Sequence, residues 1–390
     1  MSFQFSFADS DDLDLEVEPH TQTQQNHSQT SAVIDTTQDP LARELALQDL
    51  LDSLPPSLSY SPISIPLDPQ NQQQERNTLH LARRDLFDAR FQILHDAHPP
   101  EDVGDEEVAE NNLNLKDDPA TQAAAVGADS DLLPGLYEGG LKTWECAADL
   151  IAELDARRSS GGLELRGKKI IELGCGTALP SMYILSQLVS QTPPSSSESK
   201  GQTEIHLTDF NPQVLRLVTL PNLILTWFFS SPAALPFHTT TQGPDPSSTT
   251  QQHQQGTKRS PHTPAELELT PDLLSTFQSD LLQSHDIHLR FFSGPWSTLS
   301  PVLSPQPYDL VLTSETVYSL STLPSLVHIL HACSSSTALC LVAAKILYFG
   351  VGGGVHSFIN ALVPSGGHAH VVREINVGVG RAVLETSWSS

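Results

Sequence analysis

The chain is 390 residues long and carries 46 acidic against 20 basic residues, which gives a net charge of −26 at neutral pH. A chain this acidic lacks a basic surface for phosphate backbones, so we expect no direct binding of nucleic acid. Residues 1–133 hold 26 of the acidic and 6 of the basic residues and therefore contribute −20 of the charge. Residues 134–390 have the more balanced composition of a globular domain.

Cysteine and histidine usage narrows the class of protein further. The four cysteines form no C-x-x-C pair, which argues against a structural zinc site or a disulfide framework and fits a reducing cytosol or nucleus. The sixteen histidines form no cluster with metal-ligand spacing, so we expect no metal. No apolar run approaches about 20 residues, and the N-terminus turns acidic at Asp9, so we expect neither a membrane span nor a signal peptide.

Residues 1–133 are predicted to be largely disordered, because their Gln, Ser, Thr, Pro and Asp content buries too little apolar surface to offset chain entropy. Two stretches, 40–54 and 79–95, have apolar residues at helical spacing and predict short helices. These helices are either transient or docked on the folded domain or a partner. The acidic and then Ala-rich residues 101–131 are interpreted as a linker.

From Leu136 onward, short apolar strands alternate with helical stretches, which predicts an α/β domain at 134–390 with a mostly parallel sheet and helices on both faces. The expected strands are 169–173, 204–208, 286–292, 308–313 and 338–345, and a closing antiparallel pair is expected at 370–377 and 381–388. The expected helices are 147–154, 180–189, 212–218, 323–333 and 355–362. Polar low-complexity residues at 191–201 and 230–264 are interpreted as insertions.

A glycine loop follows the first expected strand, in the sequence I-I-E-L-G-C-G-T-A. Gly174 and Gly176, on either side of Cys175, allow a tight turn and a close approach of the backbone, including its amides, to a ligand. Leu179 stands where a dinucleotide-binding fingerprint needs its third glycine. The loop instead resembles the S-adenosylmethionine loop of seven-strand methyltransferases; the alternative is a generic glycine turn.

Asp209 closes the second strand, in the sequence Thr-Asp-Phe-Asn that includes Phe210 and Asn211. A carboxylate there can accept both ribose hydroxyls of a nucleoside cofactor. The usual spacing from the glycine loop is about 20 residues. Asp209 lies 33 residues beyond Gly176, or 22 without the 11-residue insertion. The alternative is that Asp209 caps the helix that begins at Pro212, a role that Asn211 could also fill.

Two further segments place candidate residues near the same crevice. Trp144 and Glu145 precede a helix and could shield a sulfonium and contact an amino group, although Trp144 alone could be core packing. The fourth strand delivers Ser314, Glu315 and Tyr318, with a solvated Glu315 as the alternative. An Asn-Pro-Pro-Tyr motif is absent, which counts against methylation of nucleobases or glutamine.

Two glycine-containing segments complete the candidate site. Gly352, Gly353 and Gly354 follow the fifth strand and would let the chain pass close to a substrate segment, or form a mere flexible loop. Trp296, after Gly294 and Pro295, could stack on an adenine ring, with core packing as the alternative.

As a set, these motifs resemble the protein-histidine N-methyltransferases, over residues 134–229 and 270–390, with a fainter likeness at 3–7 and 85–95. The resemblance implies a Rossmann-like seven-strand sheet whose last strand is antiparallel, and S-adenosylmethionine as cofactor. The cofactor residues that it implies are Thr143, Trp144, Glu145, Cys146, Ala147, Gly174, Cys175, Gly176, Asp209, Phe210, Asn211, Gly294, Pro295, Trp296 and Ser314. Pro295 stands where the family usually has an acidic residue, and the 230–264 insertion is long.

The resemblance further implies a monomeric enzyme of cytoplasm and nucleus that methylates a histidine of a basic large-subunit ribosomal protein. Neutral imidazole already has a free lone pair at pH 7, so the enzyme need only orient it. We predict that Glu315 accepts the other ring N–H and that Tyr318 packs on the ring. The alternatives are a lysine or small-molecule methyltransferase and a non-catalytic interaction protein. The acidic N-terminal segment either recruits a basic substrate or is merely a solvated tail.

Overall fold

The computed structural model describes residues 41–68, 77–97, 140–193, 201–238, 259–303 and 307–388. Within these ranges, none of the helices combines the length and the apolar character that crossing a bilayer demands. The predicted linker at 101–131, most of both predicted insertions and the likeness at 3–7 lie outside the described residues, so these predictions stay predictions.

The described chain alternates strands and helices, as the sequence predicts. The strands are β1 (Arg43–Leu45), β2 (Ser57–Pro66), β3 (Thr78–Arg84), β4 (Lys169–Leu173), β5 (Thr203–Asp209), β6 (Ala265–Glu268), β7 (Ile287–Ser293), β8 (Tyr308–Ser314), β9 (Ser334–Lys345), β10 (Gly367–Ile375) and β11 (Arg381–Trp388). The helices are α1 (Leu47–Asp52), α2 (Leu86–Ala97), α4 (Glu145–Ser159), α5 (Leu179–Val189), α6 (Pro212–Val214), α7 (Leu220–Ser230), α8 (Pro271–Ser279), α9 (Trp296–Leu299), α10 (Leu323–Cys333) and α11 (Val355–Leu362). Two π-helices, η2 (Leu215–Thr219) and η4 (Asp280–Ser284), and two 3-10 helices, η3 (Pro232–Phe237) and η5 (Val363–Ser365), complete the set.

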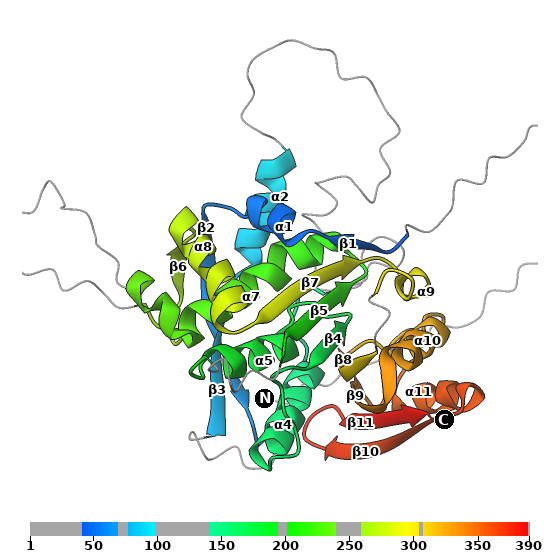
Figure 1. Ribbon diagram of the computed structural model, residues 1–390. Helices are drawn as coiled ribbons and strands as arrows, with labels where there is room; N and C mark the ends of the chain where they lie inside the picture. Colours follow the sequence, from blue (N-terminus) through cyan, green and yellow to red (C-terminus); the bar gives the residue numbers. More distant parts are fainter. Residues whose placement is uncertain are drawn as a thin grey trace, which may run out of the picture. The chain divides into compact units, whose positions relative to one another are not determined.

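The central sheet has the strand order β1-β7-β5-β4-β8-β9-β11-β10 (Figure 1). β7, β5, β4, β8 and β9 are parallel, and β11 runs antiparallel to β9. β10 and β11 form the predicted closing pair, and β1 adds an antiparallel edge strand to β7. The seven strands from β4 onward, β6 excluded, confirm the predicted mostly parallel α/β fold.

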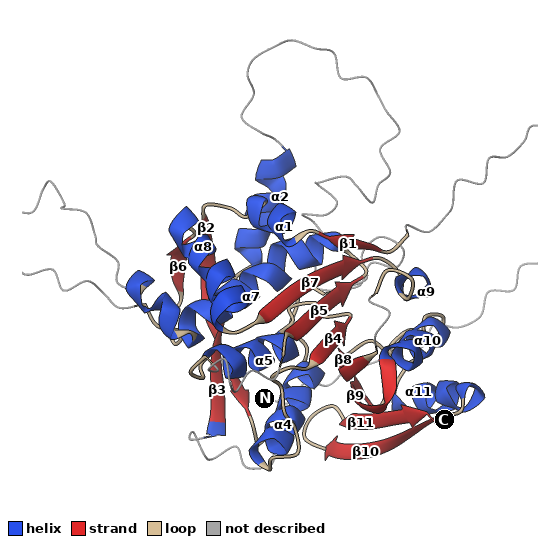
Figure 2. Ribbon diagram, viewed as in Figure 1, coloured by secondary structure: helices blue, strands red, loops and turns tan. Residues whose placement is uncertain are grey.

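Alternate residues of the central strands pack on opposite faces of the sheet, which explains their continuous apolar character. On β4, for example, Ile170 belongs to the core beneath α4, α5 and α7, whereas Ile171 and Leu173 belong to the core beneath α9, α10 and α11. Figure 2 shows helices on both sides of the strands. The sheet is therefore buried on both faces, as expected for parallel strands.

A second, three-stranded sheet (β3-β2-β6) packs on the helical layer that contains α4 and α7. Leu58 and Tyr60 of β2 are fully buried, and Tyr60 lies edge-on to Phe229, the ring centroids 5.4 Å apart. The interior position of Pro62 on β2 is tolerated because β6 pairs only with residues 57–60, so no ladder bond is lost beyond them.

The prediction of a largely disordered segment is wrong for the described residues 41–68 and 77–97, whereas the two predicted short helices are present in part, as α1 and α2. Residues 57–66 and 78–84 form the antiparallel hairpin β2–β3, and 43–45 form strand β1. The helix predicted within 40–54 is limited to the six residues of α1. The residues before it form strand β1 instead, because they pair with β7. The expected helix at 79–95 begins only at Leu86, after β3.

The buried imidazole of His206 on β5 predicts an acid-sensitive fold. Burial first, and then the charges of Arg290 and Lys169, lower the pKa of His206 to about 3. The Tyr308 hydroxyl lies 2.7 Å from Nδ1 and the Glu204 carboxylate lies 2.9 Å from Nε2, so both ring nitrogens have partners within the fold. Below about pH 6.5 the imidazole of His206 binds a proton in the unfolded chain but stays neutral in the folded chain. The free energy of unfolding therefore falls as the pH falls.

We expect this linkage to remove about 1–2 kcal/mol of unfolding free energy between pH 7 and pH 5. Urea denaturation at both pH values measures it, and the variant His206→Gln should lose less stability over the same interval. An equal pH dependence in the two proteins would show that His206 is not the titrating group.

Candidate active site

The predicted site residues converge at one edge of the sheet, where the parallel strands end. The Gly176 N–H, in the loop after β4, donates to Asp209 Oδ2 at the end of β5 over 3.0 Å. The Gly294 N–H, after β7, donates to the Asp209 carbonyl over 3.0 Å. The loops after three neighbouring strands are therefore joined through Asp209, as the strand order predicts.

The glycine loop is tight enough to need its glycines. Gly174 and Gly176 have φ angles of +63° and +51°. A Cβ at Gly174 would lie 2.8 Å from Thr316 Cγ2, and one at Gly176 would lie 3.1 Å from the Gly140 carbonyl oxygen. The Cys175 amide donates to the Thr208 carbonyl over 2.8 Å. The expectation that these amides face a ligand is thus wrong for Cys175 and Gly176, whose N–H groups tie the loop to β5.

The end of β5 presents a buried carboxylate beside an exposed aromatic ring. Asp209 is 8 % exposed, and its Oδ1 accepts the Asn211 N–H over 3.1 Å. Phe210 is 44 % exposed. The side chain of Asn211 accepts the Gln213 N–H over 2.9 Å and so caps α6, one of the roles that the sequence left open.

The loop after β7 brings Trp296 to the glycine loop. A Cβ at Gly174 would lie 3.6 Å from Trp296 Cζ2. Gly294 has a φ of +120°, and a Cβ there would lie 2.5 Å from Ala42 Cα, just before β1. Pro295 is the N-cap residue of α9. The N-terminal strand therefore packs closely on this part of the site, which the sequence did not predict.

The loop before α4 contributes polar and aromatic groups but few free side chains. Thr143 Oγ1 lies 3.0 Å from Thr177 Oγ1. Trp144 is 39 % exposed, whereas Cys146 and Ala147 belong to the core. Burial, and then the charge of Glu315, raises the pKa of the Cys146 thiol, which is therefore an unreactive packing residue.

A cluster of charged and aromatic groups surrounds Glu315. Its Oε2 accepts the Tyr348 hydroxyl over 2.6 Å, and its Oε1 accepts the Cys146 N–H over 3.3 Å. Lys345 Nζ lies 3.7 Å from Glu315 Oε1 and 3.3 Å from Glu145 Oε2. Glu315 itself has a φ of +58°, an uncommon conformation for a residue with a side chain.

Lys345 and Tyr348 were missed in the sequence analysis. The ammonium of Lys345 lies 4.7 Å from the centre of the Trp144 ring, and Tyr348 lies 6.4 Å from Tyr318 between ring centroids. Burial, and then the charge of Glu315, raises the pKa of Tyr348, so the hydroxyl stays protonated and donates. The available signal was their position at the carboxyl end of a parallel strand, since Lys345 is the last residue of β9 and Tyr348 follows it closely.

The loops after β8 and β9 are joined to each other and carry exposed apolar side chains. Gly352 forms a bridge with Ser319, and the Gly354 N–H donates to the Val317 carbonyl over 3.1 Å. Gly353 packs directly on the backbone of residue 318. The exposed apolar side chains of the two loops are Leu320, Leu347, Phe349 and Val351, of which Phe349 is 83 % exposed. We call these four residues the apolar rim.

Glu172 of β4 is a buried carboxyl group that the sequence analysis did not single out. Its Oε2 accepts the backbone N–H of Ser181 over 3.0 Å and also the Ser181 hydroxyl, near the start of α5. Burial raises the pKa of Glu172 to about 8, against the opposing hydrogen bonds from Ser181. Glu172 thereby fixes the helix that follows the glycine loop.

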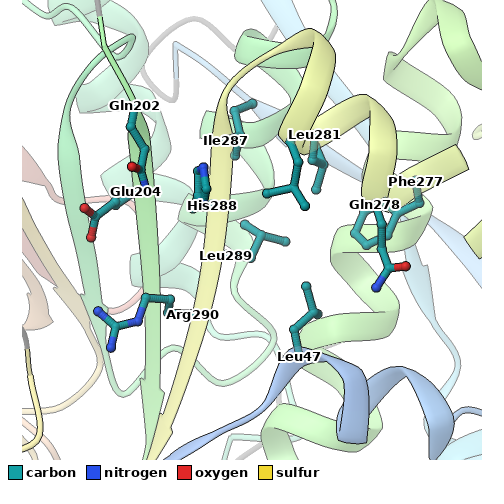
Figure 3. A pocket seen from close by; sticks show the side chains of 11 residues that line it. Leu47, Gln202, Glu204, Phe277, Gln278, Leu281, Ile287, His288, Leu289 and Arg290 are labelled. Atoms are coloured by element: carbon teal, nitrogen blue, oxygen red, sulfur yellow. The ribbon is translucent and has the colours of Figure 1, made fainter. Parts of the chain in front are cut away.

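A hollow of about 250 Å³ lies away from this edge (Figure 3). It is lined by the beginnings of β5 and β7, by α8 and η4, and by Leu47 of α1. The predicted site residues do not line it. Among the residues that the structure describes, no three His, Cys, Asp or Glu side chains converge as a set of metal ligands.

Comparisons with known proteins bear on this site. Residues 281–349 match a family model described as lysine methyltransferase. The chain is 33 % identical to histidine protein methyltransferase 1 of Schizosaccharomyces pombe, covering 65 % of this chain and 66 % of that protein. It is 32 % identical to histidine protein methyltransferase 1 of Saccharomyces cerevisiae, covering 71 % of this chain and 67 % of that protein.

A bovine homolog of histidine protein methyltransferase 1 is 32 % identical over 59 % of this chain and 49 % of its own length. Among solved structures, a magnesium protoporphyrin IX methyltransferase from Synechocystis matches 77 % of this chain and 94 % of its own at 10 % identity, with a TM-score of 0.34. The chain thus spans about two thirds of its yeast relatives and half of the bovine one. From the sequence relatives, the chain belongs to the histidine protein methyltransferase family.

Proposed function

We propose that this protein transfers a methyl group from S-adenosylmethionine to an imidazole nitrogen of a histidine in a protein substrate. The observation that carries the proposal is the 3.0 Å bond between the Gly176 N–H and Asp209, which unites the two predicted cofactor elements at the carboxyl edge of the sheet. Membership of the histidine protein methyltransferase family supports the choice of acceptor.

The residues at this edge fit a sulfonium nucleoside. The glycine loop leaves no room for side chains, Asp209 offers a carboxylate for ribose hydroxyls, and Phe210 and Trp296 offer aromatic faces for an adenine ring. Trp144 and Glu145 are the groups we assign to the methionine end. When bound, S-adenosylmethionine supplies an electrophilic methyl group on its sulfonium.

On the acceptor side, we assign Glu315 to orient the histidine ring and Tyr318 to pack on it. The Cys146 N–H, the Tyr348 hydroxyl and Lys345 hold the Glu315 carboxylate in place. A carboxylate that accepts the N–H of one ring nitrogen leaves the lone pair of the other nitrogen free to attack the methyl group. No base is needed beforehand, because the neutral imidazole is itself the nucleophile.

Replacement of Glu315 by Gln tests this assignment. We expect kcat with the protein substrate to fall about 100-fold, since an amide cannot accept the ring N–H as a carboxylate does. The affinity for S-adenosylhomocysteine, measured by calorimetry, should change less than about threefold. The control Glu385→Gln alters a half-buried carboxylate of β11 that pairs with Arg157 of α4, and it should leave turnover intact. Undiminished turnover by E315Q would remove Glu315 from the mechanism.

We further propose that the substrate is a basic ribosomal protein of the large subunit and that the enzyme acts as a monomer in cytoplasm and nucleus. The apolar rim and the glycines at 352–354 border the acceptor side and suit contact with an extended protein segment rather than with a small solute. The chain's net charge of −26 favours encounter with a basic partner.

One experiment tests the proposed reaction. The enzyme is incubated with methyl-labelled S-adenosylmethionine and a ribosomal-protein extract from cells that lack it, and mass spectrometry identifies the labelled residue. We expect 1- or 3-methylhistidine in a large-subunit protein. The match of residues 281–349 to a lysine methyltransferase model favours methyl-lysine as the second candidate product. Methyl-lysine alone would overturn the histidine assignment.

A further inference from the structure

Two hydrogen-bonded routes connect the N-terminal hairpin to the glycine loop. Arg83 and Arg84 are the last two residues of β3. This strand packs against α7, on the side of the helical layer that faces away from the central sheet. Both routes end at Thr177, the residue after the second glycine of the loop. They cross long distances in sequence, so they are properties of the fold and not of a local motif.

The first route runs through the loop before α4. Arg83 Nη1 donates to Thr143 Oγ1 over 2.9 Å, and Thr143 Oγ1 lies 3.0 Å from Thr177 Oγ1. Thr177 is 5 % exposed. The Arg83–Thr143 bond itself is partly buried, so water competes less for its partners than it would at the open surface.

The second route runs through α7. The Arg84 backbone N–H donates to Asn222 Oδ1 over 2.9 Å, and Asn222 Nδ2 donates to the Thr177 carbonyl over 2.9 Å. Asn222 is fully buried, where its polar amide needs hydrogen-bond partners. These two bonds supply one for the oxygen and one for the nitrogen. Next to it, Thr219 donates to the Gly176 carbonyl over 2.7 Å.

The π-helix η2, which directly precedes α7, is also bonded to the hairpin. The one-residue expansion of a π-helix disturbs the regular i to i−4 bonding. Arg84 Nη1 donates to the Leu217 carbonyl of η2 over 2.8 Å and also to Gln92 Oε1 over 2.9 Å. The side chain of Arg84, 1 % exposed, thereby fixes the helix that carries Thr219 and Asn222.

We propose that the β2–β3 hairpin holds the glycine loop in its cofactor-binding shape, and that Arg83 is a positioning residue for cofactor binding. The inference rests on the proposed function, because it takes the glycine loop as the cofactor site. Arg83 acts through Thr143 and Thr177 and touches no reacting atom. The hairpin is in this sense a part of the active site.

Calorimetric titration with S-adenosylhomocysteine tests the inference. We expect Arg83→Ala to weaken binding about tenfold, as loss of one charged hydrogen bond implies. In assays, the KM for S-adenosylmethionine should rise by a similar factor while kcat at saturation stays within about threefold. Arg83→Lys, which keeps a donor, should recover most of the affinity.

Two further variants separate positioning from general folding. Thr143→Val removes the acceptor of the Arg83 bond, and the double variant should bind no worse than either single one, because the two residues serve one route. The control His80→Ala removes an exposed contact to Ser64 elsewhere on the hairpin and should bind normally.

Unchanged affinity in Arg83→Ala, with or without a lower Tm, would overturn the proposal, as would fully additive losses in the double variant. Failure of the wild-type protein to bind S-adenosylhomocysteine is a separate outcome. It would refute the proposed function itself and, with it, the role given to the hairpin.

Discussion

Replacement of Asp209 by Asn is expected to lower the affinity for S-adenosylhomocysteine about 100-fold, the largest loss among single polar substitutions at the site. The carboxylate is nearly buried and accepts the N–H groups of Gly176 and Asn211. An amide in its place removes the charge that strengthens bonds to ribose hydroxyls and turns a donor toward one backbone N–H. Calorimetric titration of the purified variant measures the effect.

Asp309→Asn is the matched control. Asp309 also accepts a backbone N–H, that of Lys169, over 2.9 Å and pairs with Lys168, but it lies near the start of β8, at the opposite edge of the sheet. Its affinity for S-adenosylhomocysteine should stay within about twofold of wild type. Equal binding by D209N and wild type would mean that Asp209 is only a structural tie between β5 and the glycine loop.

Replacement of Gly353 by Ala is expected to lower turnover of the protein substrate at least about 100-fold. A Cβ at this position would lie 2.2 Å from the Tyr318 carbonyl oxygen and 2.3 Å from that of Val317, so the backbone must move. Displacement of about 1 Å at an acceptor site costs on the order of 100-fold in rate. The glycine loop and Asp209 follow β4 and β5, away from this contact, so S-adenosylhomocysteine binding should persist.

Gly350→Ala provides the comparison within the same loop. Gly350 has a φ of +82°, as unfavourable for alanine as many left-handed positions, but a Cβ there would meet open space. We expect only the strain cost of about 1 kcal/mol and nearly normal turnover. Equal losses in both variants would point to backbone strain, not to the packing of Gly353 on residue 318.

The parts of the site that lie within one short segment were predictable from the sequence. The glycine loop after β4 and Asp209 after β5 each follow a strand directly, and the parallel sheet brings such positions together. Lys345 and Tyr348 were not predicted, because their role depends on Trp144 and Glu315, which reach them only in the folded chain. The assignment of cofactor and substrate residues stays a prediction.

The N-terminal hairpin was missed for a different physical reason. The composition of residues 1–75 as a whole is polar. That overall value hides the short strand β2, in which the buried Leu58 and Tyr60 occupy alternate positions. The alternation itself was the signal that would have found it. Its neighbour β6 comes from residues 265–268, so the second sheet cannot be read from any one stretch of sequence.

The pairing of β1 with β7 has a consequence for biosynthesis. Ala42, which precedes β1, bonds to Thr298 across 256 residues. At elongation rates of about 5–20 residues per second, the edge strand waits roughly 10–50 s on the ribosome before its partner emerges. Through that interval the nascent chain carries an incomplete sheet, so prematurely terminated products are the forms most exposed to chaperones and to aggregation.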